Sequence, residues 1–91
     1  MLYVISFDLN NPNKDYRPLY NALREFTPDV HQGLPNLWFI RTNRSSIDIA
    51  NLLLLHIDGA SDKFFIGDVT AKPKNGWMFG KTWDWVNAHD S

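Results

Sequence analysis

The sequence predicts a small α+β protein, a sandwich of one sheet and two helices in a single domain spanning residues 1–91. Two observations lead to this fold class. In several short segments apolar residues alternate with a period of two, which is typical of strands, and in two longer segments they recur at helical spacing. The segments follow one another as strand, helix, strand, strand, helix, strand, and a chain of 91 residues has the length of one domain.

The first half of the chain predicts a strand, a helix and a short second strand. Residues 2–9 alternate in polarity and are rich in β-formers. After a polar loop, Asp15 is expected to cap a helix that ends before Thr27, because Thr27 precedes a proline and is disfavoured in helical conformation. Residues 29–32 are expected to form the short strand.

The second half repeats this order with stronger signals. Residues 37–42 are apolar on both faces, which indicates a central strand of the sheet. Ser45 is a typical N-cap for a helix that Gly59 is expected to end, and residues 63–70 form the fourth predicted strand. The complete order β-α-β-β-α-β is that of a ferredoxin-like sandwich, with the first and third strands central and the fourth beside the first.

Residues 72–91 form a C-terminal extension, in which residues 76–80 are strand-like and Thr82 caps a short segment. Aromatic residues make up 14% of the chain, a heavy load for one small core. They suggest a second buried surface, most simply a homodimer interface to which the extension contributes. Half-exposed aromatic side chains are the alternative.

Composition excludes several classes of function. The chain has no cysteine, which rules out disulfides and cysteine-based catalysis or metal binding. It has no Gly-rich phosphate loop or dinucleotide fingerprint, no signal-type segment and no apolar stretch of membrane-spanning length, so a cytoplasmic protein without a membrane partner is expected. The net charge of -1 predicts that any nucleic-acid binding is local.

Asp8 is the leading candidate for a functional residue, because it ends a strand that otherwise reads as core. We expect the first strand to run parallel to the third and antiparallel to the fourth, which gathers polar side chains at one end of the sheet. The expected cluster is Asp8, Asn10, Asn43, Arg44 and Asp62, with Lys63 and Arg41 at its edge. Oxygen ligands of this kind suit Mg²⁺, which assists phosphodiester cleavage. Alternatively, Asp8 is an ordinary turn residue.

Three segments carry a family resemblance: YVISFDLNNPNKDYRPLYNAL, LWFIRTNRSSIDI and the later DVT. They resemble the CRISPR-associated protein two family, related to virulence-associated protein D, and most closely its small SinR-like, Cas-two-like members. The resemblance covers most of residues 2–70 and is weak in the tail. Of the residues named above, only Asp8 matches a position that the family uses for catalysis or metal binding.

The resemblance implies a homodimer in which the two Asp8 side chains approach the two-fold axis and share one divalent metal. For part of the family it implies a metal-dependent endonuclease acting on RNA or DNA, a hydrolase with a role in antiviral defence. For another part it implies a structural subunit of the CRISPR integration complex. The DNA-spanning role needs a basic surface, and the acidic chain limits this surface to a few cations, namely Arg41, Arg44, Lys63, Lys72, Lys74 and Lys81.

The aromatic tail has two interpretations. Lysines beside aromatic residues are typical of surfaces that stack unpaired bases. The second interpretation, which the resemblance favours, is that the tail covers the sheet of the partner protomer through Trp77, Phe79, Trp83 and Trp85. The three histidines lack the spacing of a metal site; His31, on an exposed short strand, is the best outside candidate for catalysis.

The leading hypothesis is therefore a homodimeric, Cas-two-like endonuclease with an Mg²⁺ site built on paired Asp8 side chains. The alternative is a non-catalytic dimer, a nucleic-acid-binding module or a CRISPR or toxin-antitoxin accessory component in which Asp8 is structural. A third hypothesis is a ferredoxin-like sensor that binds a small molecule between its protomers.

Overall fold

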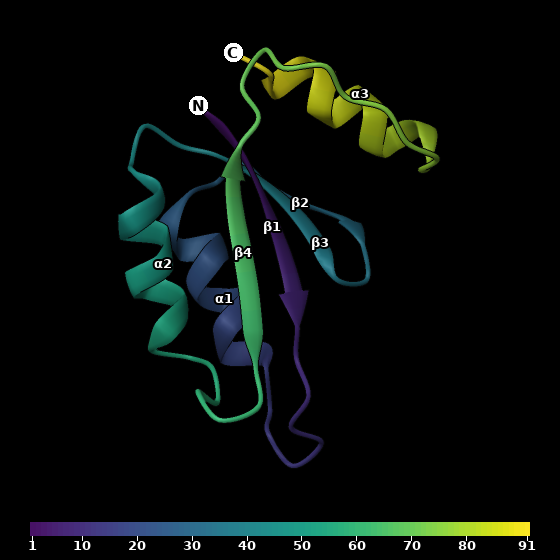
Figure 1. Ribbon diagram of the computed structural model, residues 1–91. Helices are drawn as coiled ribbons and strands as arrows, with labels where there is room; N and C mark the ends of the chain where they lie inside the picture. The colour runs from purple at the N-terminus through teal and green to yellow at the C-terminus, as the bar shows by residue number, and fades with distance from the viewer.

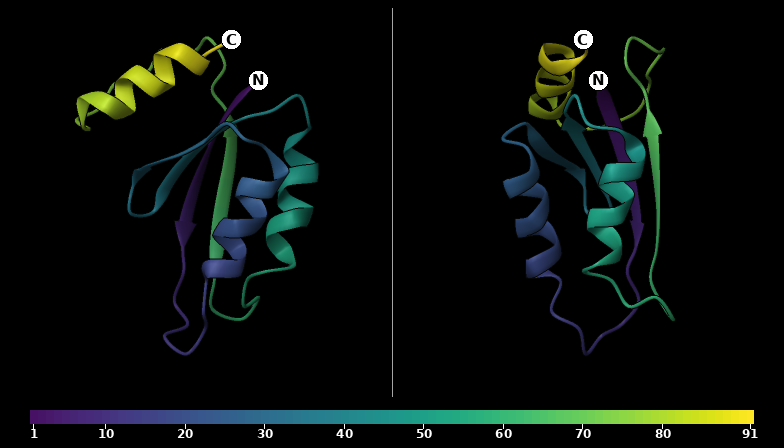
Figure 2. Two further views of the ribbon diagram at one scale, coloured as in Figure 1. Left: turned by 180° about the vertical axis from the view of Figure 1, so that it is seen from behind. Right: turned by 90° about the vertical axis from the view of Figure 1, so that its left-hand side faces the viewer.

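A four-stranded antiparallel sheet, in the order β2-β3-β1-β4, organises the molecule (Figure 1). The computed structural model describes all residues, 1–91. Helices α1 and α2 lie side by side on one face of the sheet, and α3 crosses its upper end (Figures 1 and 2). The elements are β1 (Leu2–Asp8), α1 (Arg17–Phe26), β2 (Val30–Leu34), β3 (Leu37–Arg41), α2 (Ser46–Leu54), β4 (Lys63–Asp68) and α3 (Gly80–His89).

The main core lies between the sheet and the pair α1 and α2. Alternation along β1 sends every second side chain to this face, because successive strand residues point to opposite sides. The helices contribute residues at helical spacing. The nine buried members are Tyr3, Ile5, Phe7, Leu19, Leu23, Trp38, Ile40, Ile49 and Leu53.

Strand β1 is antiparallel to β3, so the expected parallel pairing was wrong. Leu2 lies opposite Arg41 and Ser6 lies opposite Leu37. The cause is the hairpin between β2 and β3. The crossover through α1 returns the chain in β2 with the direction of β1, and the hairpin then reverses it, so β3 must run against β1. The strand order and directions are compatible with a ferredoxin-like sandwich.

The helix starts differ in how well the sequence predicted them. Ser45 caps α2 as expected, since its Oγ accepts a hydrogen bond from the backbone N–H of Asp48 at 3.2 Å. Helix α1 begins at Arg17 without a side-chain cap. Asp15 instead accepts from the Arg17 backbone N–H at 3.0 Å and pairs with the Arg17 guanidinium. Helix α2 also ends earlier than expected, at Leu54.

The C-terminal extension is a helix, and residues 76–80 contain no strand, in contrast to the prediction. Thr82 lies inside α3 and does not cap it, because its buried hydroxyl bonds His31 Nε2 on β2 at 2.9 Å. Val86 packs with Leu2 and Phe39 in a second, smaller core on the opposite face of the sheet from α1 and α2. No helix in the structure is both long and apolar enough to cross a lipid bilayer.

Candidate functional site

Asp8 ends β1 on the face of the sheet opposite α1 and α2. Leu2 and Val4, which share this side of the strand, pack in the smaller core beneath α3, whereas Asp8 lies beyond that cover and is exposed. Directly across on β4 lies Lys63, and the next outward residue of β4 is Phe65, opposite Ser6. Helix α3 therefore leaves part of this face of the sheet uncovered. This open face carries Asp8 on β1 and Lys63 and Phe65 on β4.

The carboxylate of Asp8 makes no hydrogen bond or ion pair within the chain, which sets it apart from most acids of the protein. Seven of the ten acidic side chains are hydrogen-bonded, namely Asp15, Asp29, Asp48, Asp58, Asp62, Asp68 and Asp90. The remaining ones are Asp8, Glu25 and Asp84. Among these three, Asp8 alone extends from the sheet. The interpretation of Asp8 as a turn residue finds no support in a side-chain contact to the loop.

Asp62, in contrast, is a structural residue. It is buried, and its two oxygens accept three hydrogen bonds. The donors are the backbone N–H of Asn10 at 2.8 Å, the hydroxyl of Tyr16 at 2.7 Å and the backbone N–H of Asp58 at 2.8 Å. Asp62 thereby joins the loop that follows Asp8 to the loop before β4.

The hydrogen bonds to Asp62 also set its protonation state. Burial acts to raise the pKa of this carboxyl, but the bonds from Tyr16, Asn10 and Asp58 outweigh it, and the net pKa is lowered. The same contacts raise the pKa of Tyr16, for which desolvation is the largest cause and the bond to Asp62 the next. Asp62 is therefore ionised near neutral pH, with its oxygens occupied by donors and turned away from a metal.

Asn10 and Lys63 lie beside Asp8, as predicted. The side-chain amide of Asn10 donates to the backbone carbonyls of Asp8 at 3.3 Å and of Ser61 at 3.1 Å. Asn10 therefore holds the backbone that carries Asp8. Lys63 makes no hydrogen bond or ion pair in the structure, so its ammonium group is free to meet an anion next to Asp8.

Asn43, Arg41 and Arg44 lie at the opposite end of the sheet, which corrects the predicted cluster. The antiparallel register places Arg41 beside Leu2 at the start of β1. The prediction failed because it rested on a parallel pairing of the first and third strands. A basic surface around Asp8 therefore contains Lys63 but neither of these arginines.

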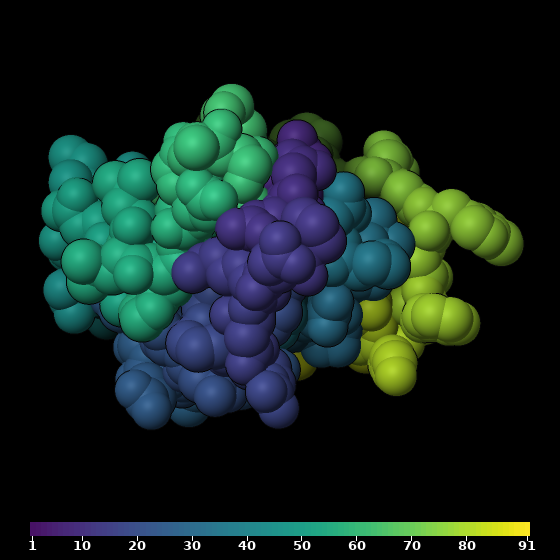
Figure 3. Space-filling view, turned by 90° about the horizontal axis from the view of Figure 1, so that it is seen from below, coloured from purple at the N-terminus to yellow at the C-terminus, as the bar shows by residue number.

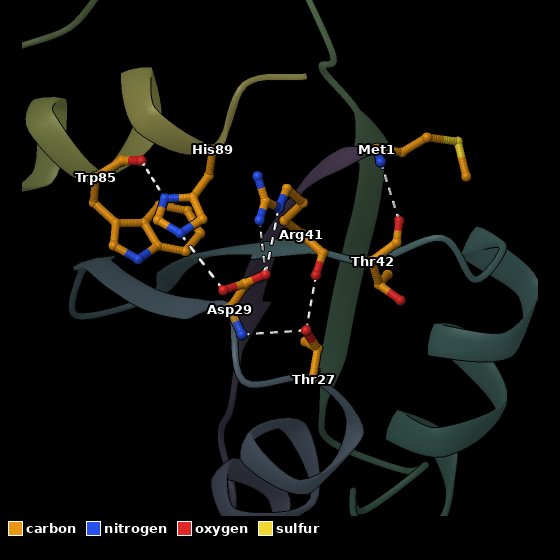
Figure 4. A network of polar contacts seen from close by, with 7 residues as sticks. All are labelled: Met1, Thr27, Asp29, Arg41, Thr42, Trp85 and His89. Atoms are coloured by element: carbon orange, nitrogen blue, oxygen red, sulfur yellow. Dashed lines mark hydrogen bonds and ion pairs between the residues drawn. The ribbon is translucent and has the colours of Figure 1, made fainter.

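At their own end of the sheet the two arginines are paired with acids. Arg41 binds Asp29 at 3.2 Å, and Arg44 binds Asp48 at 3.2 Å. Figure 4 shows that Asp29 also faces His89 of α3, with 3.5 Å between Asp29 Oδ1 and His89 Nε2. The contacts among Arg41, Asp29 and His89 hold α3 against the end of the sheet, so we regard them as structural.

The four aromatic residues of the tail separate into two pairs. Trp85 stacks between His31 and His89, with ring centroids 5.5 Å and 4.0 Å apart, and Trp83 lines a groove against its own sheet. These two side chains are engaged within their own chain. Trp77 is 99% exposed and Phe79 is 75% exposed, so only this pair is free for a partner. A role for all four in a dimer interface stays a prediction.

His31 is part of the docking surface of α3 and is not exposed in the way the sequence suggested. Its ring bonds Thr82 and stacks on Trp85. Burial, and after it the charges of Lys81 and His89, lower its pKa. Because Nε2 of this half-buried imidazole is hydrogen-bonded to Thr82 of α3, we assign His31 a structural role.

Two features of the site escaped sequence reasoning. Phe65, 68% exposed, lies on the open face in the edge strand β4. The alternation of residues 63–68 contained this signal, since Phe64 and Ile66 pack against the main core and Phe65 must point the other way. The acceptor role of Asp62 had no such signal, because it depends on two loops that meet only in the folded chain.

The chemistry available to one chain at this site is limited. No group of three or more metal-ligating acids or histidines is present. Asp8 offers one free carboxylate, and Mg²⁺ is commonly held by one or two carboxylates with water completing its shell. A second Asp8 from another copy would supply the other carboxylate. One chain thus offers a single free carboxylate for a hard cation at this site.

The chain matches no family model, no curated protein and no solved structure in the comparisons with known proteins.

Proposed function

We propose that the protein is a homodimeric, metal-dependent phosphodiesterase of nucleic acids, in which the open sheet faces of two copies meet and the two Asp8 side chains share one Mg²⁺. The observation that carries the proposal is the free carboxylate of Asp8 on the uncovered part of the sheet, beside the exposed ring of Phe65. The resemblance of residues 2–70 to the CRISPR-associated protein two family supports the same reading.

The open face has the character of a surface that pairs with a copy of itself. A two-fold axis passing close to Asp8 would bring the two Asp8 side chains together, and every other contact of the face would occur twice, as in an isologous dimer. Phe65 lies next to Gly67, whose missing side chain leaves room beside the ring; an added Cβ there would approach Phe65 Cε2 at 3.3 Å. Burying this ring removes apolar area from water and favours association.

The residues of the chain have distinct parts in the proposed reaction. The two Asp8 carboxylates hold the cation, and Asn10 and Asp62 fix the loop that follows Asp8. Lys63, free of intrachain partners, attracts the phosphate that is to be cleaved. When bound, a divalent cation lowers the pKa of a water molecule and offsets charge on the phosphate.

Cleavage assays with single-stranded RNA and DNA in Mg²⁺ test the proposal. We expect Asp8→Asn to lower the rate on the order of a hundredfold, as removal of one electrostatic group in an active site commonly does. Asp84→Asn is the matched control, because this exposed acid on α3 also lacks partners and lies away from Asp8. Equal activity of wild type and Asp8→Asn, or no activity of the wild type across pH and divalent metals, would contradict the proposal.

A non-catalytic dimer is the second candidate, favoured by the position of Arg41 and Arg44. These cations are paired with acids at the end of the sheet remote from Asp8, so they do not extend a phosphate-binding surface around it. This candidate predicts dimers in sedimentation experiments for wild type and Asp8→Asn alike, with no Mg²⁺-dependent cleavage by either.

A further inference from the structure

We propose that Trp77 and Phe79 form a stacking surface for the unpaired bases of single-stranded nucleic acid. The proposal rests on the proposed function and names its substrate class. It concerns the segment between β4 and α3, which contributes neither to the sheet nor to a helix.

The exposure of these two rings is the first support. A tryptophan that is 99% exposed and a phenylalanine that is 75% exposed gain nothing for the fold, because their apolar surface stays in water. In contrast, Trp83, a few residues along, is half-buried and lines a groove with Leu37 and Phe39 of the sheet, and Trp85 stacks on His31. Of the four aromatic residues in the tail, only Trp77 and Phe79 are therefore available to bind a ligand.

The charge around the rings favours a polyanion. Residues 69–83 contain three lysines and no acid, in a chain whose net charge is -1. Lys81 Nζ lies 5.9 Å from the centroid of the Phe79 ring, whereas Lys72 follows Ala71, whose N–H bonds Asp90 at the other end of α3. Lys74 is occupied by Asp90 at 2.6 Å. Lys81, in the first turn of α3, is therefore the cation beside the rings, and a cation next to exposed aromatic rings is an arrangement that holds single strands without sequence preference.

The rings open onto a hollow that can receive a base. It has a volume of about 420 Å³ and is lined by Gly33, Leu34, Trp77, Met78, Phe79 and Gly80. Its apolar walls suit the flat faces of bases, while the exposed Lys81 is available to a phosphate. A duplex keeps its bases stacked on one another, so only an unpaired strand can offer them to Trp77 and Phe79.

The hollow lies at the same end of the sheet as Asp8. It includes residues of the hairpin between β2 and β3, and the tip of that hairpin reaches β1 through a bond from Phe7 N–H to the Asn36 carbonyl at 2.8 Å. Figure 3 views this end of the molecule, with the loop after β1 in front and the yellow-green segment before α3 projecting to one side. A strand stacked on the rings could continue toward Asp8.

A binding experiment in EDTA separates this proposal from the catalytic one. Labelled oligothymidylate and oligouridylate are titrated by fluorescence anisotropy at low salt with the wild type and with Asp8→Asn, in which chemistry is disabled. We expect both proteins to bind, with quenching of the tryptophan fluorescence. Trp77→Ala should weaken binding about tenfold, within the range for loss of one base-stacking ring. Trp77→Phe, which retains a ring, should lose less than about threefold.

Ile47→Ala is the matched control, since Ile47 is another exposed apolar side chain, in the first turn of α2 on the opposite face of the sheet, and its removal should leave binding unchanged. Phe79→Ala gives an independent second test. Equal binding by Trp77→Ala and the wild type, competition by duplex DNA as strong as by single strands, or absence of binding would each overturn the proposal. So would conversion of a dimer to a monomer by Trp77→Ala, which would assign the rings to a contact between copies.

Discussion

The two faces of the sheet differ in what their side chains do. On one face, α1 and α2 enclose a core of nine buried residues, and hardly any surface of the strands is left uncovered. On the other, α3 covers a core of only three buried residues, and the rest of β1 and β4 lies open with Asp8, Lys63 and Phe65. The first face stabilises the fold, and the second leaves exposed surface that a partner can contact.

This difference predicts opposite responses to removing a large side chain. Leu23→Ala, on the covered face, should lower the free energy of unfolding by about 2–5 kcal/mol, because it leaves a cavity in a packed core. Phe65→Ala should change it by less than about 1 kcal/mol in the monomer. Chemical denaturation at a concentration below dimerisation measures both. A loss for Phe65→Ala as large as for Leu23→Ala would show that the face is closed.

The smaller core can be perturbed through Gly33, where α3 approaches β2 closely. A Cβ at this position would come within 2.8 Å of the Phe39 ring and 3.2 Å of Thr82 Cγ2. Gly33→Ala should therefore cost about 1–3 kcal/mol by overpacking and loosen α3. Hydrogen exchange should show faster exchange in residues 80–89 and unchanged exchange in α1. Unchanged exchange throughout would show that α3 accommodates the added methyl group.

A pH titration tests the contacts beneath α3 without changing the packing, because it acts on the protonation of His31. Because the pKa of His31 is lowered in the folded chain, the unfolded chain binds a proton first as the pH falls below 6.5. Stability should then decrease, and it should stop decreasing once the folded form is protonated as well. His31→Gln should remove this step, whereas His56→Gln, at the end of α2, should keep it. Thermal unfolding between about pH 7 and 5 measures the difference.

Carboxylates dominate at lower pH. The lowered pKa of Asp62 means that its contribution is present above the ordinary value of 3.8 and is lost as the pH falls through the folded value. Asp48, Asp58, Asp68 and Asp90 shift in the same direction because each accepts hydrogen bonds. The histidine step and the carboxylate step should therefore be separate in the same titration.

The sequence predicted the covered face better than the open one, for a physical reason. Period-two alternation and helical spacing report which residues are buried, so the order of strands and helices and the cap at Ser45 were correctly predicted. The direction of β3 follows from the crossover and the hairpin that precede it, and the sequence predicted both, so the error lay in the topology inferred from these elements and not in the patterns that predicted them. That error moved Arg41, Asn43 and Arg44 to the wrong end of the sheet.

The tail shows a second limit of local patterns. Alternating glycines and aromatic residues at 76–80 resemble a strand, but a strand needs a partner edge, and here the chain remains irregular until Gly80. The helix that follows is fixed by contacts distant in sequence, from His31 to Thr82 and from Asp29 to His89. Such contacts cannot be inferred from spacing within the tail.

The most direct test of the central claim is whether two copies of Asp8 meet. The chain has no cysteine, so Asp8→Cys and the control Asp84→Cys each introduce a single thiol. Treated with a short bifunctional thiol reagent at a concentration where sedimentation shows dimers, Asp8→Cys should be cross-linked rapidly and completely, and Asp84→Cys slowly or not at all. Cross-linking of Asp84→Cys at the same rate, or a protein that stays monomeric, would contradict the pairing of the open faces around Asp8.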